Sequence, residues 1–169
     1  TYRLSSMRGE QRKDPENRLL AHMNHRRLDA EAIRDTMLSV SGALNLEMGG
    51  ATFPASLKTD VDFRFEEPRR SVYVPVFRSS LPELFEVFDF ANTSLVTGRR
   101  DLSTVAPQAL FMMNHPFVRA QAKLTAERLL HDSQPKEAQR IDHAYLRILG
   151  RHGTAKEIAL CQEFLKSVI

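Results

Sequence analysis

The chain has 169 residues, of which 42% are hydrophobic and 27% are charged, and its formal net charge is +3. A chain of this length and composition buries about 70% of its unfolded surface, which excludes an intrinsically disordered protein. The longest apolar run, Ala109–Met113, is far shorter than the ~20 residues of a membrane-spanning helix, so no membrane span is expected.

The charge distribution and the cysteine content argue against further classes of partner and cofactor. Basic residues are scattered from Arg3 to Arg151 with acids between them, whereas nucleic-acid-binding domains usually gather positive charge on one stripe. We therefore expect no nucleic-acid partner. The single cysteine, Cys161, excludes an internal disulfide and is expected to be a small buried side chain. No Cys-x-x-Cys-His motif attaches haem, so no cofactor is expected in this segment.

The N-terminal segment 1–13 is polar and basic, and we interpret it as an extension from a longer chain. The remaining residues, 14–169, are expected to form one domain. Because Thr1 is not a methionine, a targeting segment is expected upstream or already removed.

Two helices are predicted in the first third of the chain. Asp14-Pro15-Glu16 supplies an N-cap, a proline in the first turn and an acid, and the helix after it would turn Leu19, Leu20 and Met23 inward. Asp29 is expected to cap a second helix that reaches about Leu44. Its apolar side chains are spaced at 4, 3 and 4 residues, and they are Ile33, Met37, Val40 and Leu44.

The period then changes. Residues 60–66 alternate apolar and charged side chains, and residues 71–77 are rich in valine and aromatics, with a possible turn at 67–70. This pattern predicts a β-hairpin around residues 60–77. Pro75 has no N–H to donate, so the second strand is expected at an edge.

Helical periodicity returns at Pro82 and continues to the end. A short helix is predicted up to about Asp89, then a loop over 90–101, then a helix capped by Ser103 or Thr104. Asn114-His115-Pro116 breaks that helix from the next, which runs over 117–130. Two last helices, from Pro135 to Gly150 and from the capping box Thr154–Glu157 onward, are predicted to form an αα-hairpin. The fold class is therefore mainly α: a single-domain helical bundle with a small β-hairpin and a C-terminal αα-hairpin.

Several ordered blocks resemble an uncharacterised C-terminal domain of planctomycete proteins that carry cytochrome-c-like modules, the planctomycete surface domain family. The blocks are residues 14–20, 26–35, 41–42, 49–50, 69–76, 104–110 and 114–118. The chain departs from the family pattern after Phe88-Asp89, where Phe90 stands instead of a proline. The resemblance implies an exported, multidomain bacterial protein at the periplasm or cell surface. Any haem would belong to another domain, and the partners would be other domains of the same polypeptide or an exported protein.

Two groups of polar residues are candidate sites. The better one combines two arginines with the start of a helix, where free N–H groups favour a small anion or an acidic partner. Its members are Arg99, Arg100, Ser103, Thr104 and Gln108. The alternative is that the hydroxyls only cap the helix and that the glutamine is a buried hydrogen bonder.

The secondary polar cluster lies around the start of the helix that Asp29 is expected to cap, and arginine forks could grip an anion or a carbonyl there. Its members are Arg27, Glu31, Arg34 and Asp35. The alternative is a set of ion pairs that tie this helix to its neighbours. The nearby arginines would keep both acids ionised, so neither suits a general acid, and no catalytic residue is assigned.

His22 and His25 stand three residues apart, a spacing that could place both imidazoles on one helical face as metal ligands. No second pair lies in reach, so solvated histidines are the preferred interpretation and no metal is assigned.

Three functional hypotheses follow. The leading one is a non-catalytic structural or interaction module of a larger exported protein. The second is part of an enzyme that acts on extracellular polymers, which requires the two polar clusters to converge in one cleft. The third is a carbohydrate-binding module, which is weakened because the chain has no Trp and only three Tyr to serve as sugar platforms.

Overall fold

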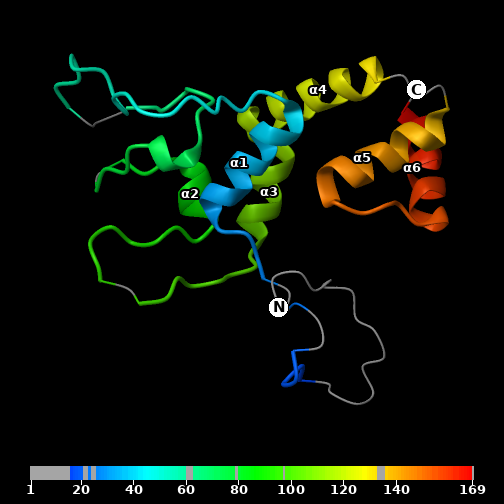
Figure 1. The fold of residues 1–169 in the computed structure, drawn as a ribbon, viewed down its shortest axis with the longest axis horizontal. Helices are drawn as coiled ribbons and strands as arrows, with labels where there is room; N and C mark the ends of the chain where they lie inside the picture. The colour runs from blue at the N-terminus through cyan, green and yellow to red at the C-terminus, as the bar shows by residue number, and fades with distance from the viewer. Residues whose placement is uncertain are drawn as a thin grey trace.

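The computed structural model describes residues 16–20, 23, 26–59, 63–78, 80–96, 98–132 and 136–168. Within these residues the protein is mainly helical, as expected, with no β-strand (Figure 1). The elements in chain order are α1 Ala30–Ser41, the 3₁₀ turn η1 Ser71–Tyr73, α2 Glu83–Val87, α3 Ala106–Asn114, α4 Pro116–His131, α5 Glu137–Leu149 and α6 Ala155–Val168.

Helix boundaries in the second and last thirds follow the local signals. Pro116 is the first residue of α4, and the preceding His115 is extended with φ −65° and ψ 132°, which separates α3 from α4. Gly150 ends α5 in the left-handed region, with φ of +68°. In the first third, Gly42 ends α1 in the same way with φ of +82°, so this helix ends at Ser41 and not at the predicted Leu44. The predicted capping box is confirmed, because Thr154 N donates to Glu157 Oε2 at 2.8 Å and Glu157 N donates to Thr154 Oγ at 3.3 Å.

The start of the chain differs from its prediction. Residues 1–13, Asp14 and Pro15 lie outside the described residues. Glu16 to Leu20 form turns instead of a helix, and Asn17 and Leu20 have φ of +52° and +54°. A right-handed helix cannot pass through residues in the left-handed region. The helix predicted from Asp14 is therefore not formed over 16–20.

The prediction of a β-hairpin over residues 60–77 is also wrong for residues 63–77. Residues 60–62 lie outside the described residues. Residues 63–66 belong to no strand, and Ser71–Tyr73 is a 3₁₀ turn. The backbone of this stretch bonds elsewhere: Asn45 N donates to the Pro68 carbonyl at 2.8 Å, and the bridge of residue 69 is to residue 45. Alternation of apolar and polar residues indicates an extended, half-buried chain but not which segment it pairs with.

The hydrophobic core lies among α1–α4 and the segment before α2. Ala30, Val74, Leu84, Phe85 and Phe111 form its buried cluster. Phe85, 1% exposed, stacks on the ring of Phe90 with centroids 4.9 Å apart. Figure 1 shows these helices gathered together, with long irregular segments extending from them.

The C-terminal αα-hairpin is confirmed but contributes no fully buried side chain. The two helices pack side by side, to one side of the α1–α4 core (Figure 1). Arg147 Nη2 lies 3.0 Å and His143 Nδ1 3.4 Å from Asp132 Oδ2 at the end of α4. Cys161 is half-buried, with its Sγ 3.8 Å from Tyr145 Oη. None of the described helices is long and apolar enough to cross a membrane.

Candidate functional site

Helix α1 is the link between two irregular segments of the chain. Residues at its N-terminal end contact the segment 89–108. Arg34 and Asp35, about one turn further along the helix, contact the segment 67–71. We call the first group the Asp89 cluster: Arg27, Glu31, Asp89, Arg100, Ser103 and Gln108. We call the second the Arg34 cluster: Arg34, Asp35, Glu67, Arg69 and Ser71.

Asp89 is the centre of its cluster. It follows α2 with φ +59°, a left-handed conformation that Asp tolerates better than most side chains. Its Oδ2 accepts from the backbone N of Ser103 at 2.8 Å, and its Oδ1 accepts from the Ser103 hydroxyl at 2.7 Å. These hydrogen bonds, with smaller contributions from Arg27 and Gln108, hold the pKa of Asp89 below its ordinary value.

Arg27 completes the contact from the side of α1. It lies before the first residue of the helix, and its Nη1 donates to the Ser103 carbonyl and lies 3.6 Å from Asp89 Oδ2. Its guanidinium is 5.9 Å from the ring centroid of Phe88. Arg27 and Glu31 thus each contact the 89–108 segment.

Glu31 and Arg100 form a two-point ion pair. Arg100 Nη1 and Nη2 donate to the two carboxylate oxygens at 2.7 and 2.8 Å, and the guanidinium is 4.9 Å from the Phe90 ring. Burial would raise the pKa of Glu31, but the hydrogen bonds and charge of Arg100 outweigh it and lower the pKa. Glu31 therefore stays ionised at neutral pH.

Gln108 is buried in the first turn of α3. Its Oε1 accepts from Val105 N at 3.3 Å, and its Nε2 donates to the Val87 carbonyl at 3.0 Å. The N-cap residue is Val105. Ser103, predicted as a possible cap, is bonded to Asp89 instead, while the glutamine satisfies the free N–H of the helix start.

The Arg34 cluster holds the 67–71 segment in place of the absent β-hairpin. Arg34 donates to the carbonyls of Arg69 at 2.8 Å and Glu67 at 2.7 Å, and to Ser71 Oγ at 3.3 Å. Asp35 Oδ1 accepts from Ser71 N at 2.7 Å. The side chains of α1 thus satisfy backbone groups that a strand partner would otherwise satisfy.

The sequence-predicted site residues are therefore only partly brought together. Arg100, Ser103 and Gln108 of the first candidate site meet Arg27 and Glu31 of the second in the Asp89 cluster. Arg99 and Thr104 are exposed, and Arg34 and Asp35 belong to the other cluster. Asp89 was missed by sequence reasoning. Its only local signal is an Asp at a helix end, which indicates a turn and not the partner 14 residues away.

The sequence also gave no sign of a cavity beside α1. It has a volume of about 670 Å³ and is lined by parts of α1, the segments 63–68 and 80–84, and α4. Arg34 lines it, whereas the Asp89 cluster does not.

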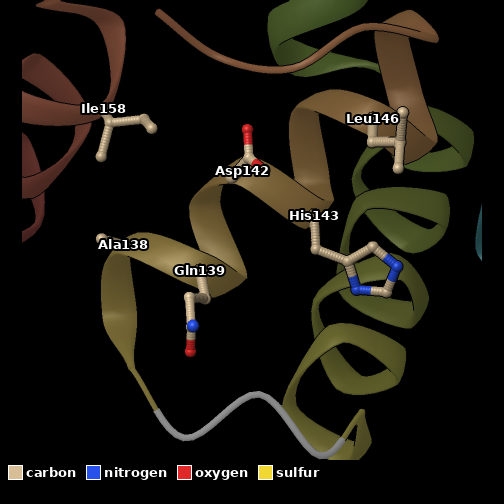
Figure 2. A pocket seen from close by; sticks show the side chains of 6 residues that line it. All are labelled: Ala138, Gln139, Asp142, His143, Leu146 and Ile158. Carbon is tan, nitrogen blue, oxygen red and sulfur yellow. The ribbon is translucent and has the colours of Figure 1, made fainter. Parts of the chain in front are cut away.

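A second, open depression of about 410 Å³ lies between α5 and α6. In Figure 2 Asp142 and His143 point in different directions from α5, with the ring of His143 directed away from Ile158 of α6. Asp142 contacts His152 Nδ1 at 2.9 Å and accepts from Gly153 N at 2.9 Å, interactions that lower the pKa of Asp142.

His22 and His25, the two histidines considered as possible metal ligands, lie outside the described residues. Among those described, no group of three or more His, Cys, Asp or Glu side chains is placed to hold a metal.

Comparison with known proteins identifies the family but not an activity. The family model PSD1, described as a protein of unknown function (DUF1553), matches residues 1–165. The chain therefore belongs to the PSD1 family, an uncharacterised domain family. Searches of curated proteins and of solved structures gave no significant match.

Proposed function

We propose that this chain is a non-catalytic structural and interaction module of a larger exported bacterial protein, in which any haem is held by a cytochrome-c-like domain elsewhere in the polypeptide. The observation that carries the proposal is that the acidic side chains of the Asp89 cluster are hydrogen-bonded to other residues of the same cluster. Glu31 is held by two hydrogen bonds from Arg100, and Asp89 by two from Ser103. These groups hold loops to α1.

The polymer-active enzyme is less well supported because it requires the same polar groups to reach a substrate. A general acid needs a pKa near the working pH, and the pKa values of Glu31 and Asp89 are both lowered. Arg27 and Glu31 meet the first predicted site in the Asp89 cluster, but Arg34 and Asp35 contact the 67–71 segment. The two predicted groups are therefore brought together only in part.

The carbohydrate-binding module needs an open aromatic platform, and Tyr73 is one of the two tyrosines among the described residues. The guanidinium of Arg69 lies 3.9 Å from the Tyr73 ring centroid, and the Tyr73 hydroxyl accepts from Gly49 N at 2.8 Å. One face of that ring is therefore covered by the protein's own side chain.

The C-terminal hairpin supports the interaction part of the proposal. Its helices expose apolar side chains, and soluble proteins seldom leave large groups of these uncovered without an interaction partner. Those at least 39% exposed are Leu146, Ile148, Leu149, Leu160, Phe164, Leu165 and Val168. In the full-length polypeptide we expect another domain to cover part of this surface.

Hydrogen–deuterium exchange with radical footprinting tests this expectation on the isolated chain and on the full-length polypeptide. We expect α5 and α6 to exchange more slowly and Phe164 to be less labelled in the full-length protein. The exposed Val72, which lies on η1, serves as an internal reference for labelling. Identical exchange and labelling of the hairpin in both proteins would contradict the proposal.

A further inference from the structure

The cavity beside α1 has the size and lining of a small-molecule site. Its volume of about 670 Å³ falls within the range of roughly 300–1,000 Å³ that is usual for ligand pockets. Much of its wall is apolar, from Leu38, Phe63, Phe65, Leu81 and Phe117. Such a wall favours a ligand with a hydrophobic body.

The buried polar group of this wall is Arg34, which is 8% exposed. Its guanidinium lies 5.5 Å from the Phe65 ring centroid and 6.0 Å from that of Phe117. Arginine has five N–H donors, and acceptors among the described residues are found for three of them. One N–H on Nη2 and the Nε–H remain.

The charge of Arg34 is also less closely balanced than that of Arg100. Its carboxylate neighbour is Asp35, whose Oδ1 lies 3.8 Å from Arg34 Nη1 and accepts from Ser71 N. Burial lowers the pKa of Arg34, and the charge of Asp35 opposes this only in part. A buried cation without a close two-point partner is stabilised by an added anion.

The other charged side chains of the wall do not change this balance. Arg64, Glu66 and Glu83 are exposed and carry both signs. His115 Nδ1 accepts from Phe117 N at 3.2 Å, so in the neutral ring the proton is on Nε2, which lies 3.4 Å from Glu83 Oε2. Glu83 therefore has a partner of its own.

We propose that this cavity binds a small monocarboxylate with an aromatic body. The carboxylate accepts hydrogen bonds from the two remaining N–H groups of Arg34, and the aromatic body packs against Phe65 and Phe117. This inference is independent of the interaction role, because the cavity lies in the α1–α4 half of the chain.

The test is titration of the chain with 3-phenylpropionate, followed by calorimetry and by methyl NMR of Leu38 and Leu81. We expect saturable binding with shifts at these two methyl groups, and binding of the neutral amide weaker by about tenfold. Absence of binding up to about 10 mM, or equal binding of acid and amide, would overturn the proposal.

Two variants locate the site without removing Arg34. Ala43 lines the cavity and is half-buried, so the larger side chain of Ala43→Leu should narrow the cavity and weaken binding. Ala126 is exposed on α4, so Ala126→Leu should bind like the unaltered chain. Unchanged binding by Ala43→Leu would place the probe elsewhere and overturn the assignment. Arg34→Lys, checked for native circular dichroism, should lose the preference for acid over amide.

Discussion

Glu31 and Arg100 are joined by two hydrogen bonds of 2.7 and 2.8 Å across a sequence separation of 69 residues. The pair fixes the segment before α3 to the first turn of α1. Together with Asp89 and Ser103, it makes an irregular segment part of the packed structure.

Arg100→Gln is expected to lower the free energy of unfolding by about 1 kcal/mol, because a two-point pair with about a third of each side chain exposed contributes modestly. Urea denaturation measures the loss. Arg99→Gln is the matched control, since Arg99 is exposed, and it should leave stability unchanged. The double variant with Glu31→Gln should be little worse than either single one; additive losses would show that the two residues do not interact.

The ionised form of Asp89 should stabilise the fold, so the free energy of unfolding should fall in acid as this carboxylate is protonated. Its folded pKa is lowered by Ser103, so the stabilisation is complete above the unfolded pKa of about 3.9 and is lost as pH falls through the folded value. Asp89→Asn keeps the tolerance for positive φ but cannot ionise. Thermal unfolding from pH 6 to pH 2 should therefore show a smaller loss for this variant. An acid profile parallel to that of the unaltered chain would rule out the assignment.

Gly42 and Gly150 both have positive φ, but their surroundings differ. A Cβ on Gly42 would lie 2.9 Å from Arg128 Nη1, whereas nothing lies within 4 Å of one on Gly150. Gly150→Ala should cost about 1 kcal/mol from backbone strain alone. Gly42→Ala should cost more, because Arg128 must also leave the Val40 carbonyl, 3.3 Å away. In an Arg128→Ala background this excess, measured by urea denaturation, should disappear.

Phe85 and Phe164 test where the core lies. Phe85→Ala should cost about 3–5 kcal/mol, because a nearly fully buried ring leaves a cavity. Phe164, 65% exposed on α6, should cost less than about 0.5 kcal/mol when replaced by Ala in the isolated chain. Equal losses in differential scanning calorimetry would mean that the hairpin shares the core.

The ends of the later helices could be predicted from sequence because their causes are local. Pro116 cannot donate an N–H, Gly150 adopts positive φ without a side-chain clash, and Thr154 and Glu157 lie three residues apart on one turn. Each signal acts within a few residues of the boundary that it sets. The later helices and the C-terminal hairpin were therefore predictable, whereas the helix predicted from Asp14 is not formed over 16–20.

The 60–77 segment shows where the sequence stops being sufficient. Alternation marks an extended chain with one apolar face, but a strand also needs a neighbour with free backbone groups. Here Arg34 takes the carbonyls of Glu67 and Arg69, and Asp35 takes the Ser71 N–H. The side chains of α1 therefore occupy backbone groups that a neighbouring strand would need, and this depends on where α1 lies in the tertiary structure.

The same holds for the candidate site. Composition and helix spacing identified the arginines and acids on α1 and before α3 as polar groups of interest. Tertiary structure alone decided that Arg27 and Glu31 face the 89–108 segment while Arg34 faces a cavity. The physical reason is that hydrogen bonds and ion pairs act over a few ångströms of space, whatever the separation along the chain, whereas helix caps and breaks act between sequence neighbours.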